Sequence, residues 1–309
     1  MTSLNGKDIL HGNQFSKKDI EAIMKTASYF EKELKKKGSL SLLKGKLLAN
    51  LFYEPSTRTR LSFEAAMQRL GGGVISMGSV ESSSVAKGES LTDTVMTVSQ
   101  YADVIVLRHP RTGSAREAAD AVSIPVINAG DGTGQHPTQA LLDIYTIKKE
   151  LGTLSNLTIS MVGDLKNGRT VHALVELLAL FGAKLYFVSP DSLRMPVEIT
   201  SRLKEKGVEV HETADMKLAA KKSDLIYMTR IQKERFTDLS EYERVKGSYI
   251  INEKFLEDIK KEIVILHPLP RVDEIDPAVD QYSGAAYFRQ MRNGVYVRMA
   301  LLAMIFGKR

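Results

Sequence analysis

Cysteine is absent from the 309 residues of this chain, and histidine is scarce, with 6 residues. Without cysteine the chain can form no disulfide and no thiolate metal site, and it has no cysteine nucleophile. The histidines show no His-Glu-x-x-His spacing, which argues against a zinc hydrolase. No run of 18 apolar residues occurs, and the first residues lack the apolar core of an export signal. These absences predict a cytoplasmic protein without a membrane partner.

The charge of the chain is modestly basic. Lys and Arg number 43 and Asp and Glu 37, which leaves a net charge of +6. A nucleic-acid-binding protein gathers its basic residues in a patch interleaved with aromatic residues. Here they are scattered, and the lysines at 35–37 stand beside glutamates, as on a solvated helix surface. We therefore expect no nucleic-acid partner, and we interpret the excess as a few arginines placed to bind an anion.

The length predicts two domains, since a domain takes about 150 residues. Short apolar runs alternate with helical patterns along the chain. Strands are predicted at 46–52, 74–77, 103–107, 125–128, 157–162, 184–188, 208–211, 225–229 and 263–266, and helices at 61–70, 91–101, 115–121, 137–151, 169–181, 196–206 and 297–306. This alternation predicts two α/β units, each with a parallel sheet covered by helices on both faces. The units are expected to join near 137–151.

Residues 55–60 (Pro-Ser-Thr-Arg-Thr-Arg) lie between a predicted strand and a predicted helix. Free backbone N–H groups at the start of a helix favour an anion, and arginine binds phosphate oxygens with two parallel hydrogen bonds. A lone Ser-Thr pair here would be an ordinary helix cap. Five consecutive polar residues of phosphate-binding type instead predict an anion site.

Residues 163–170 (Gly-Asp-Leu-Lys-Asn-Gly-Arg-Thr) also follow a predicted strand. They nearly match two nucleotide-binding patterns, but Arg169 replaces the P-loop lysine and Leu165 replaces the middle glycine of the dinucleotide motif. The loop instead brings Arg169 to the carboxyl edge of a sheet. Arg108 and Arg230 each end a predicted strand in the same way, and together these arginines indicate a site for a polyanion.

In combination these motifs resemble the aspartate/ornithine carbamoyltransferase family. Residues 56–60 (Ser-Thr-Arg-Thr-Arg) are similar to its carbamoyl-phosphate signature. Further matches follow in the family's order at 84–90, 108–110, 128–132, 136–139, 163–166, 228–235 and 267–274. The resemblance covers the chain from about residue 50 to its end and is specific because so many motifs agree.

The acceptor implied by the resemblance is L-aspartate. Ornithine enzymes carry His-Cys-Leu-Pro late in the chain, whereas residues 267–270 here read His-Pro-Leu-Pro. A dicarboxylate also needs cations, which Arg169, Arg230 and Lys87 can supply. Two alternatives stay open: a carbamoyltransferase for another amine, and a nucleotide-binding or non-catalytic Rossmann-like protein, suggested by 163–168 with Asp191.

The resemblance implies attack of the aspartate amine on carbamoyl phosphate, which releases N-carbamoyl-L-aspartate and phosphate in the committed step of pyrimidine synthesis. No metal, cofactor or covalent enzyme intermediate is expected. The implied catalytic residues are Arg58, Thr59, Arg108 and His136. The implied substrate-binding residues are Ser56, Thr57, Ser84, Lys87, Gln139, Arg169, Arg230, Gln232, Leu269 and Pro270.

The implied roles assign these residues to different parts of the two substrates. Residues 56–59 and Arg108 hold the phosphate, and Thr59, Arg108 and His136 donate to the carbonyl oxygen. The carbamoyl NH2 is bound by Gln139 and by the backbone carbonyls of residues 269 and 270. Arg169, Arg230 and Gln232 orient aspartate.

The family fold is two doubly wound parallel-sheet domains with the active site between them. The implied domains are a carbamoyl-phosphate-binding domain, 1–136, with the C-terminal helix 286–309 packed back on it, and an aspartate-binding domain, 137–285. Lys87 and a serine, Ser84 or alternatively Ser83, are expected to reach a neighbouring subunit's site from an exposed loop. This implies a homotrimer with shared sites, and a separate regulatory chain is possible. Two departures from the family are Ala86, where many relatives have a second lysine, and Asn167 in place of tyrosine.

Overall fold

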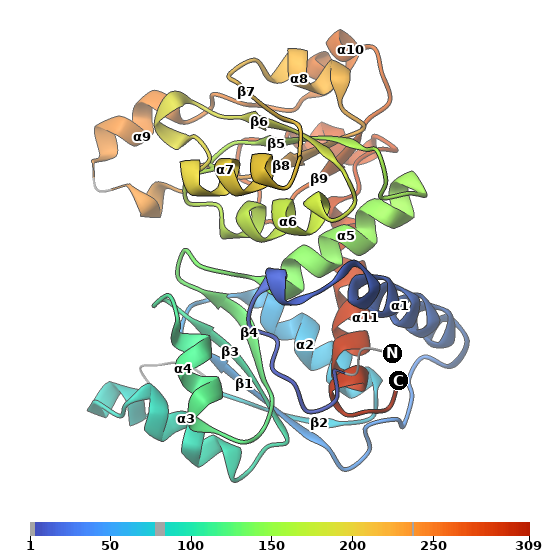
Figure 1. The fold of residues 1–309 in the computed structure, drawn as a ribbon, viewed down its shortest axis with the longest axis vertical. Coiled ribbons are helices and arrows are strands. Elements are labelled where there is room, and N and C mark those ends of the chain that lie inside the picture. The colour runs from blue at the N-terminus through green and yellow to red at the C-terminus, as the bar shows by residue number, and fades with distance from the viewer. Residues whose placement is uncertain (1–3, 78–83, 237) are drawn as a thin grey trace. The chain divides into compact units, whose positions relative to one another are not determined.

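The computed structural model describes residues 4–77, 84–236 and 238–309. They form two compact units (Figure 1). The first contains the chain up to Tyr145 together with Met291–Arg309, and the second contains Thr146–Gln290. The chain therefore leaves the first unit within one long helix and returns to it within another. Both units are α/β, as the sequence predicts.

The first unit is built on a four-stranded parallel sheet. Its strands are β1 (Leu47–Phe52), β2 (Gly73–Ser76), β3 (Val104–His109) and β4 (Val126–Asp131), in the spatial order β2-β1-β3-β4. Its helices are α1 (Lys17–Lys37), α2 (Thr57–Arg69), α3 (Leu91–Ser99), α4 (Ser114–Ala121), the first part of α5 (Pro137–Leu151) and most of α11 (Tyr287–Ile305), with short 3-10 turns η1 (Gly12–Gln14) and η2 (Ser84–Lys87). Each strand thus needs a helical crossover to reach its parallel neighbour.

Helices cover both faces of this sheet, which explains its continuous apolar strands. Ala49 and Leu51 belong to a buried cluster with residues of α3 and α4. Asn50, on the opposite face of β1, instead donates from Nδ2 to Glu64 Oε1 of α2 at 3.5 Å. Figure 1 shows α3 and α4 together on one side of the strands and α2 on the other. Beyond the strand ends at the sheet's carboxyl edge, Pro55 after β1 and Pro110 after β3 are exposed.

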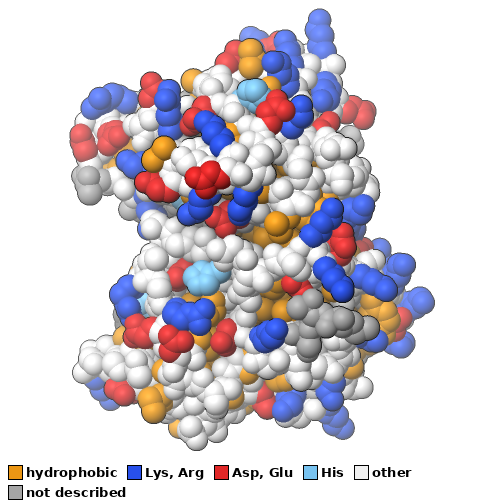
Figure 2. Space-filling view, in the orientation of Figure 1, with side chains coloured by type: hydrophobic (Ala, Val, Ile, Leu, Met, Phe, Trp, Pro, Cys, Tyr) orange, Lys and Arg blue, Asp and Glu red, His pale blue; other side chains and the backbone are white. Residues whose placement is uncertain are grey.

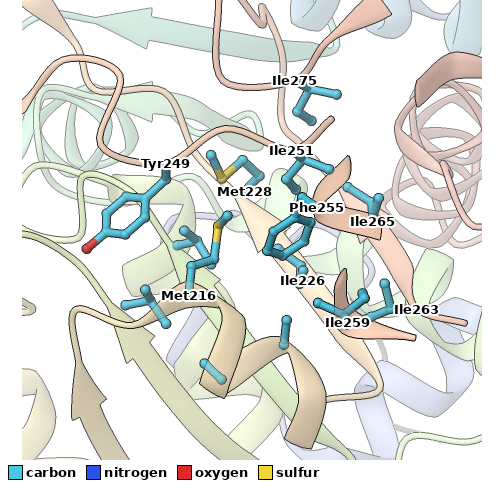
Figure 3. Packing of buried hydrophobic residues seen from close by; sticks show 14 of the residues in the cluster. Met216, Ile226, Met228, Tyr249, Ile251, Phe255, Ile259, Ile263, Ile265 and Ile275 are labelled. Carbon is cyan, nitrogen blue, oxygen red and sulfur yellow. The ribbon is translucent and has the colours of Figure 1, made fainter. Parts of the chain in front are cut away.

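The second unit has a five-stranded parallel sheet. Its strands are β5 (Thr158–Val162), β6 (Lys184–Val188), β7 (Val210–Thr213), β8 (Leu225–Met228) and β9 (Val264–Leu266), in the order β7-β6-β5-β8-β9. Its helices are α6 (Arg169–Ala179), α7 (Val197–Glu205), α8 (Met216–Lys222), α9 (Leu239–Val245) and α10 (Glu253–Ile259), with 3-10 turns η3 (Asp191–Leu193), η4 (Lys233–Arg235) and η5 (Pro277–Gln281). One core cluster gathers around Phe255 of α10, with Ile226 of β8 and Ile265 of β9 (Figure 3).

Three helical segments differ from the sequence-based prediction. Helix α2 begins at Thr57 rather than at residue 61, so the polar motif forms its first turn. Helix α11 begins at Tyr287 rather than at residue 297. Its first half was not predicted because buried polar residues interrupt the apolar pattern there. Ser84–Lys87 forms a 3-10 turn where a loop was expected.

For helix α1 the sequence indicated only a solvated helix surface at 35–37; its full extent was not predicted, although it has both a cap and an apolar face. Ser16 accepts from the Asp19 backbone N–H, and the Asp19 carboxylate accepts from the Ser16 N–H, which is a capping box. Ile20, Ile23 and Phe30 are buried along one side. The many lysines of this segment dilute that pattern in the sequence.

The surface shown in Figure 2 mixes the two signs of charge. Basic and acidic side chains are interspersed over both units, and exposed apolar side chains are mostly scattered. Among the described residues, no helix combines the length and apolarity needed to cross a bilayer.

Candidate functional site

The order of the strands points to one edge of each sheet. In the first unit the chain runs from β1 outward to β2 and then crosses to the other side for β3 and β4. Ligands of open α/β sheets bind at the carboxyl ends of the strands where the order reverses, which here lies between β1 and β3. Phe52 pairs with Arg108 at that point, and the Tyr53 N–H donates to the Arg108 carbonyl at 2.8 Å.

The first turn of α2 follows β1 directly at this edge. Ser56 is its N-cap residue, but its hydroxyl makes no capping hydrogen bond. Thr57 and Arg58 are exposed, whereas Thr59 is buried. The helix start therefore presents backbone N–H groups, hydroxyls and one guanidinium, which is the arrangement that binds a phosphate.

Arg108 extends from the neighbouring strand into the same region. Its Nη1 donates to the Ala129 carbonyl of β4 at 3.3 Å, and its Nη2 lies 3.1 Å from Glu54 Oε2. Only 13% of the Arg108 side chain is exposed, so solvent weakens the electrostatic interactions of its guanidinium less than it would at the surface. Glu54 was missed by the sequence analysis, since no spacing marks its contact with Arg108.

His136 and Gln139 lie after β4, at the start of α5. The His136 carbonyl accepts from the Gln139 N–H at 3.0 Å, and both side chains are buried. The preceding loop is tied by Asp131, which accepts from the backbone N–H groups of Gly113 and Gln135 at 2.9 and 2.8 Å. The structure thus brings residues 56–59, Arg108, His136 and Gln139 to one edge of the first sheet.

The second unit repeats this arrangement at the reversal between β5 and β8. Gly163 directly follows β5 with φ +116°, and a Cβ there would lie 2.2 Å from the Thr229 carbonyl oxygen. Thr229 donates from its backbone N–H and from Oγ1 to the Val162 carbonyl, at 2.8 and 2.9 Å. Only glycine permits this close approach of the two loops. One loop leads to Arg169 and the other to Arg230.

Two buried groups fix the loop before Arg169, the first residue of α6. Asp164 accepts from the Asn167 backbone N–H at 2.9 Å, and His172 Nε2 donates to the Leu165 carbonyl at 2.7 Å. Burial raises the pKa of Asp164 and lowers that of His172, against hydrogen bonds that favour their charged forms. Asn167 therefore has a clear local role in this chain.

Gln232 is oriented by a residue that the sequence analysis missed. Arg235 Nε donates to Gln232 Oε1 at 3.2 Å. The carboxamide oxygen is therefore engaged, and its NH2 group remains as the donor for a ligand. A donor beside Arg230 suits a carboxylate.

Leu269 and Pro270 follow β9 and are joined by a cis peptide bond. Leu269 has φ +55°, a left-handed conformation that a branched residue adopts only when its surroundings impose it. The imposing group is His267, whose Nδ1 accepts the Leu269 N–H at 2.7 Å. His267 Nε2 in turn donates to Glu274 Oε1 at 2.7 Å.

Glu274 completes this buried network and was not singled out from the sequence. Its Oε2 accepts from the backbone N–H groups of Val272 and Asp273, at 3.1 and 3.2 Å. Burial works to raise the pKa of Glu274, but the hydrogen bond from His267, the charge of His267 and the backbone N–H groups together outweigh it and hold the pKa below the usual value. The network fixes the direction of the carbonyls at 269 and 270.

Glu274→Gln should lower the urea midpoint of unfolding at pH 7, because one carboxamide cannot accept from all three donors. The free energy of unfolding should fall by about 1–3 kcal/mol. The carboxylate has a lowered pKa in the folded state, so its contribution is present above pH ~4.3 and is lost as the pH falls through the folded-state pKa. The difference between wild type and variant should therefore shrink from pH 6 to pH 3. A difference that stays constant would show that ionisation of Glu274 does not stabilise the fold.

Ser84 and Lys87 lie apart on the exposed turn η2. The turn is closed by hydrogen bonds from the Gly88 N–H to Val85 and from the Glu89 N–H to Ser84, at 2.9 and 3.3 Å. Ser83, the alternative to Ser84, lies outside the described residues. The structure therefore does not bring these two side chains together with the site residues at either sheet edge.

The comparisons with known proteins cover both units. The family model "Aspartate/ornithine carbamoyltransferase, carbamoyl-P binding domain" matches residues 7–149, and the family's "Asp/Orn binding domain" matches residues 155–305. The chain is 57% identical over 303 residues to an aspartate carbamoyltransferase catalytic subunit of Thermococcus gammatolerans, with 98% of each chain covered.

Two solved structures are also similar. Aspartate transcarbamoylase of Trypanosoma cruzi, in complex with carbamoyl phosphate and aspartate, has a TM-score of 0.94 at 44% identity, covering 98% of this chain and 97% of that one. The catalytic subunit of M. jannaschii aspartate transcarbamoylase has a TM-score of 0.91 at 51% identity, covering 98% of this chain and 99% of that one. With both family models matched along nearly the whole sequence, the chain belongs to the aspartate/ornithine carbamoyltransferase family.

Proposed function

We propose that this chain transfers the carbamoyl group of carbamoyl phosphate to the amine of L-aspartate, producing N-carbamoyl-L-aspartate and phosphate for pyrimidine synthesis. The observation that carries the proposal is the placing of cationic residues at the strand-order reversal of each sheet. The first has a phosphate-type helix start with Arg108, and the second has Arg169 and Arg230. The T. cruzi relative was solved with both of these substrates.

In the first unit, residues 56–59 and Arg108 hold the phosphate of carbamoyl phosphate. Thr59, Arg108 and His136 donate to the carbonyl oxygen, which becomes an oxyanion when the amine attacks. Donors fixed before the reaction stabilise that charge without reorganising, and each is worth roughly 3–4 kcal/mol. Glu54 neutralises part of the positive charge of Arg108 until the phosphate binds.

In the second unit, Arg169 and Arg230 bind the aspartate carboxylates with the Gln232 NH2 group. The carbonyls of Leu269 and Pro270, directed by His267, accept from the carbamoyl NH2 together with Gln139. Much of the rate then comes from positioning the amine. The departing phosphate accepts the amine proton, so the reaction requires no dedicated protein base.

The direct test is turnover of carbamoyl phosphate by the purified chain with different amines, followed by a colorimetric assay of the ureido product. L-Aspartate should support turnover, and L-ornithine should not, because no acidic partner is assigned to its side-chain ammonium. Turnover with another amine alone would favour the alternative acceptor, and no turnover with any amine would remove the proposal.

We also propose a homotrimer in which Ser84 and Lys87 act in the neighbouring subunit's site. The exposure of both side chains on η2 supports this. So does the edge strand β2, three of whose four residues are exposed. An uncovered strand edge is usually protected in a native protein, and a neighbouring subunit would protect it.

Lys87→Ala and Arg58→Ala chains, each nearly inactive alone, should regain activity when mixed and reassembled. In a cyclic trimer about one site in four then combines an intact Arg58 with an intact Lys87 from the neighbour. Native mass spectrometry would verify that mixed trimers form. Mixed trimers as inactive as their parents would show that Lys87 does not act in trans.

The domain division 1–136 with 286–309, and 137–285, stays a prediction. So do the cytoplasmic location and a separate regulatory chain.

A further inference from the structure

A buried acidic residue lies one helical turn beyond Gln139. Asp143 is fully buried on α5, and its Oδ1 accepts from Gln139 Nε2 at 2.9 Å. Residues four apart share one face of a helix, so this contact is fixed by the helix itself. An ionised carboxylate only accepts hydrogen bonds, so it selects the NH2 end of the Gln139 amide and turns Oε1 the other way. No further side-chain hydrogen bond of Gln139 occurs in the part of the chain described here.

The charge of Asp143 has a buried counterpart on α11. Arg298 is 3% exposed, its Nη1 donates to Ser62 Oγ at 2.9 Å, and its guanidinium lies 5.0 Å from the centre of the Phe63 ring. Burial lowers the pKa of Arg298 to about 10, and the negative charge of Asp143 opposes that shift. Gly294 leaves room for the guanidinium, since a Cβ there would lie 2.6 Å from Nη1. A buried charge persists when it has such a partner.

We propose that Asp143, with Arg298 as its counter-charge, is a positioning residue that makes Gln139 an acceptor for the carbamoyl NH2. This rests on the proposed function for the identity of the ligand. Carbamoyl phosphate differs from acetyl phosphate by NH2 in place of methyl, and only NH2 can donate to Gln139 Oε1. The pair Asp143–Gln139 therefore sets the preference of this chain for a carbamoyl over an acetyl group.

The test compares dissociation constants for carbamoyl phosphate, acetyl phosphate and inorganic phosphate. In Asp143→Asn, the residue at 143 can donate as well as accept, so Gln139 is no longer held in one orientation. The preference for carbamoyl over acetyl phosphate should fall about tenfold, while phosphate affinity stays unchanged. Ser62→Ala, which removes a contact of Arg298 but leaves the Gln139–Asp143 bond, should keep the full preference.

Two further variants separate positioning from stability. Asp143→Asn combined with Arg298→Met removes both buried charges, so folding recovers while the preference stays lost. In a Gln139→Leu background, Asp143→Asn should change the preference no further, because the two residues act as one. Equal weakening of all three ligands, an unchanged preference, or an effect that persists without Gln139 would each overturn the inference. Absence of aspartate-dependent turnover in wild type would instead count against the proposed function, since the binding ratio is measured without aspartate.

Discussion

Arg58→Ala should reduce turnover by about a hundred- to a thousandfold, the cost of removing a preorganised charged donor from a site of this kind. The residue is exposed in the first turn of α2, where its guanidinium can meet the phosphate together with the backbone N–H groups. Steady-state kinetics with carbamoyl phosphate as the varied substrate would measure the loss.

The fold should tolerate this change, because an exposed residue contributes less than about 0.5 kcal/mol to stability. Arg69→Ala is the matched control: Arg69 stands in the last turn of the same helix, where it donates to the Gly38 carbonyl. That variant should keep its turnover. Near-normal activity of Arg58→Ala would remove the phosphate assignment from the helix start.

Arg230→Ala should raise the KM for aspartate about a hundredfold while changing the KM for carbamoyl phosphate little. A carboxylate there loses a bidentate, charge-assisted partner. Arg230→Lys should restore little, since an ammonium cannot reproduce the planar fork.

The matched control for this variant is Arg194→Ala in the same unit, since Arg194 is exposed and pairs with Asp191 at 2.7 Å. Its kinetics should match wild type. If Arg230→Ala raises both KM values equally, Arg230 belongs to the phosphate rather than to aspartate.

The parallel sheets and the positions of the arginines at their edges were predictable because they depend on short stretches of sequence, whereas the roles of the site residues came from the family resemblance and stay predictions. A strand buried on both faces is a continuous apolar run, as in β3, whose residues 104–107 are buried. The polar residues directly after such strands are carried to one edge by the topology alone. The edge residues Arg108, Arg169 and Arg230 needed no knowledge of tertiary contacts.

The groups that hold the site residues in place could not be predicted in the same way. Glu54 meets Arg108 across two strands, and Glu274 meets His267 within a buried loop. Each contact joins residues whose separation follows no helix or strand period. The carboxylates look like ordinary surface acids in the sequence, and only their contacts in the folded chain reveal their role. The predicted helix at 297–306 was too short for a similar reason, because Gln290 and Asn293 in the first half of α11 are buried polar residues.

The return of the chain into the first unit constrains the order in which the protein can fold during synthesis. Residues 146–290 form a unit of their own and are complete before Met291–Arg309 leave the ribosome. The first unit, although its strands are made first, must wait for α11 to cover its interior. The part that is translated first is therefore the last to be finished, and its apolar surface stays exposed meanwhile, which is when nascent chains are most prone to aggregate.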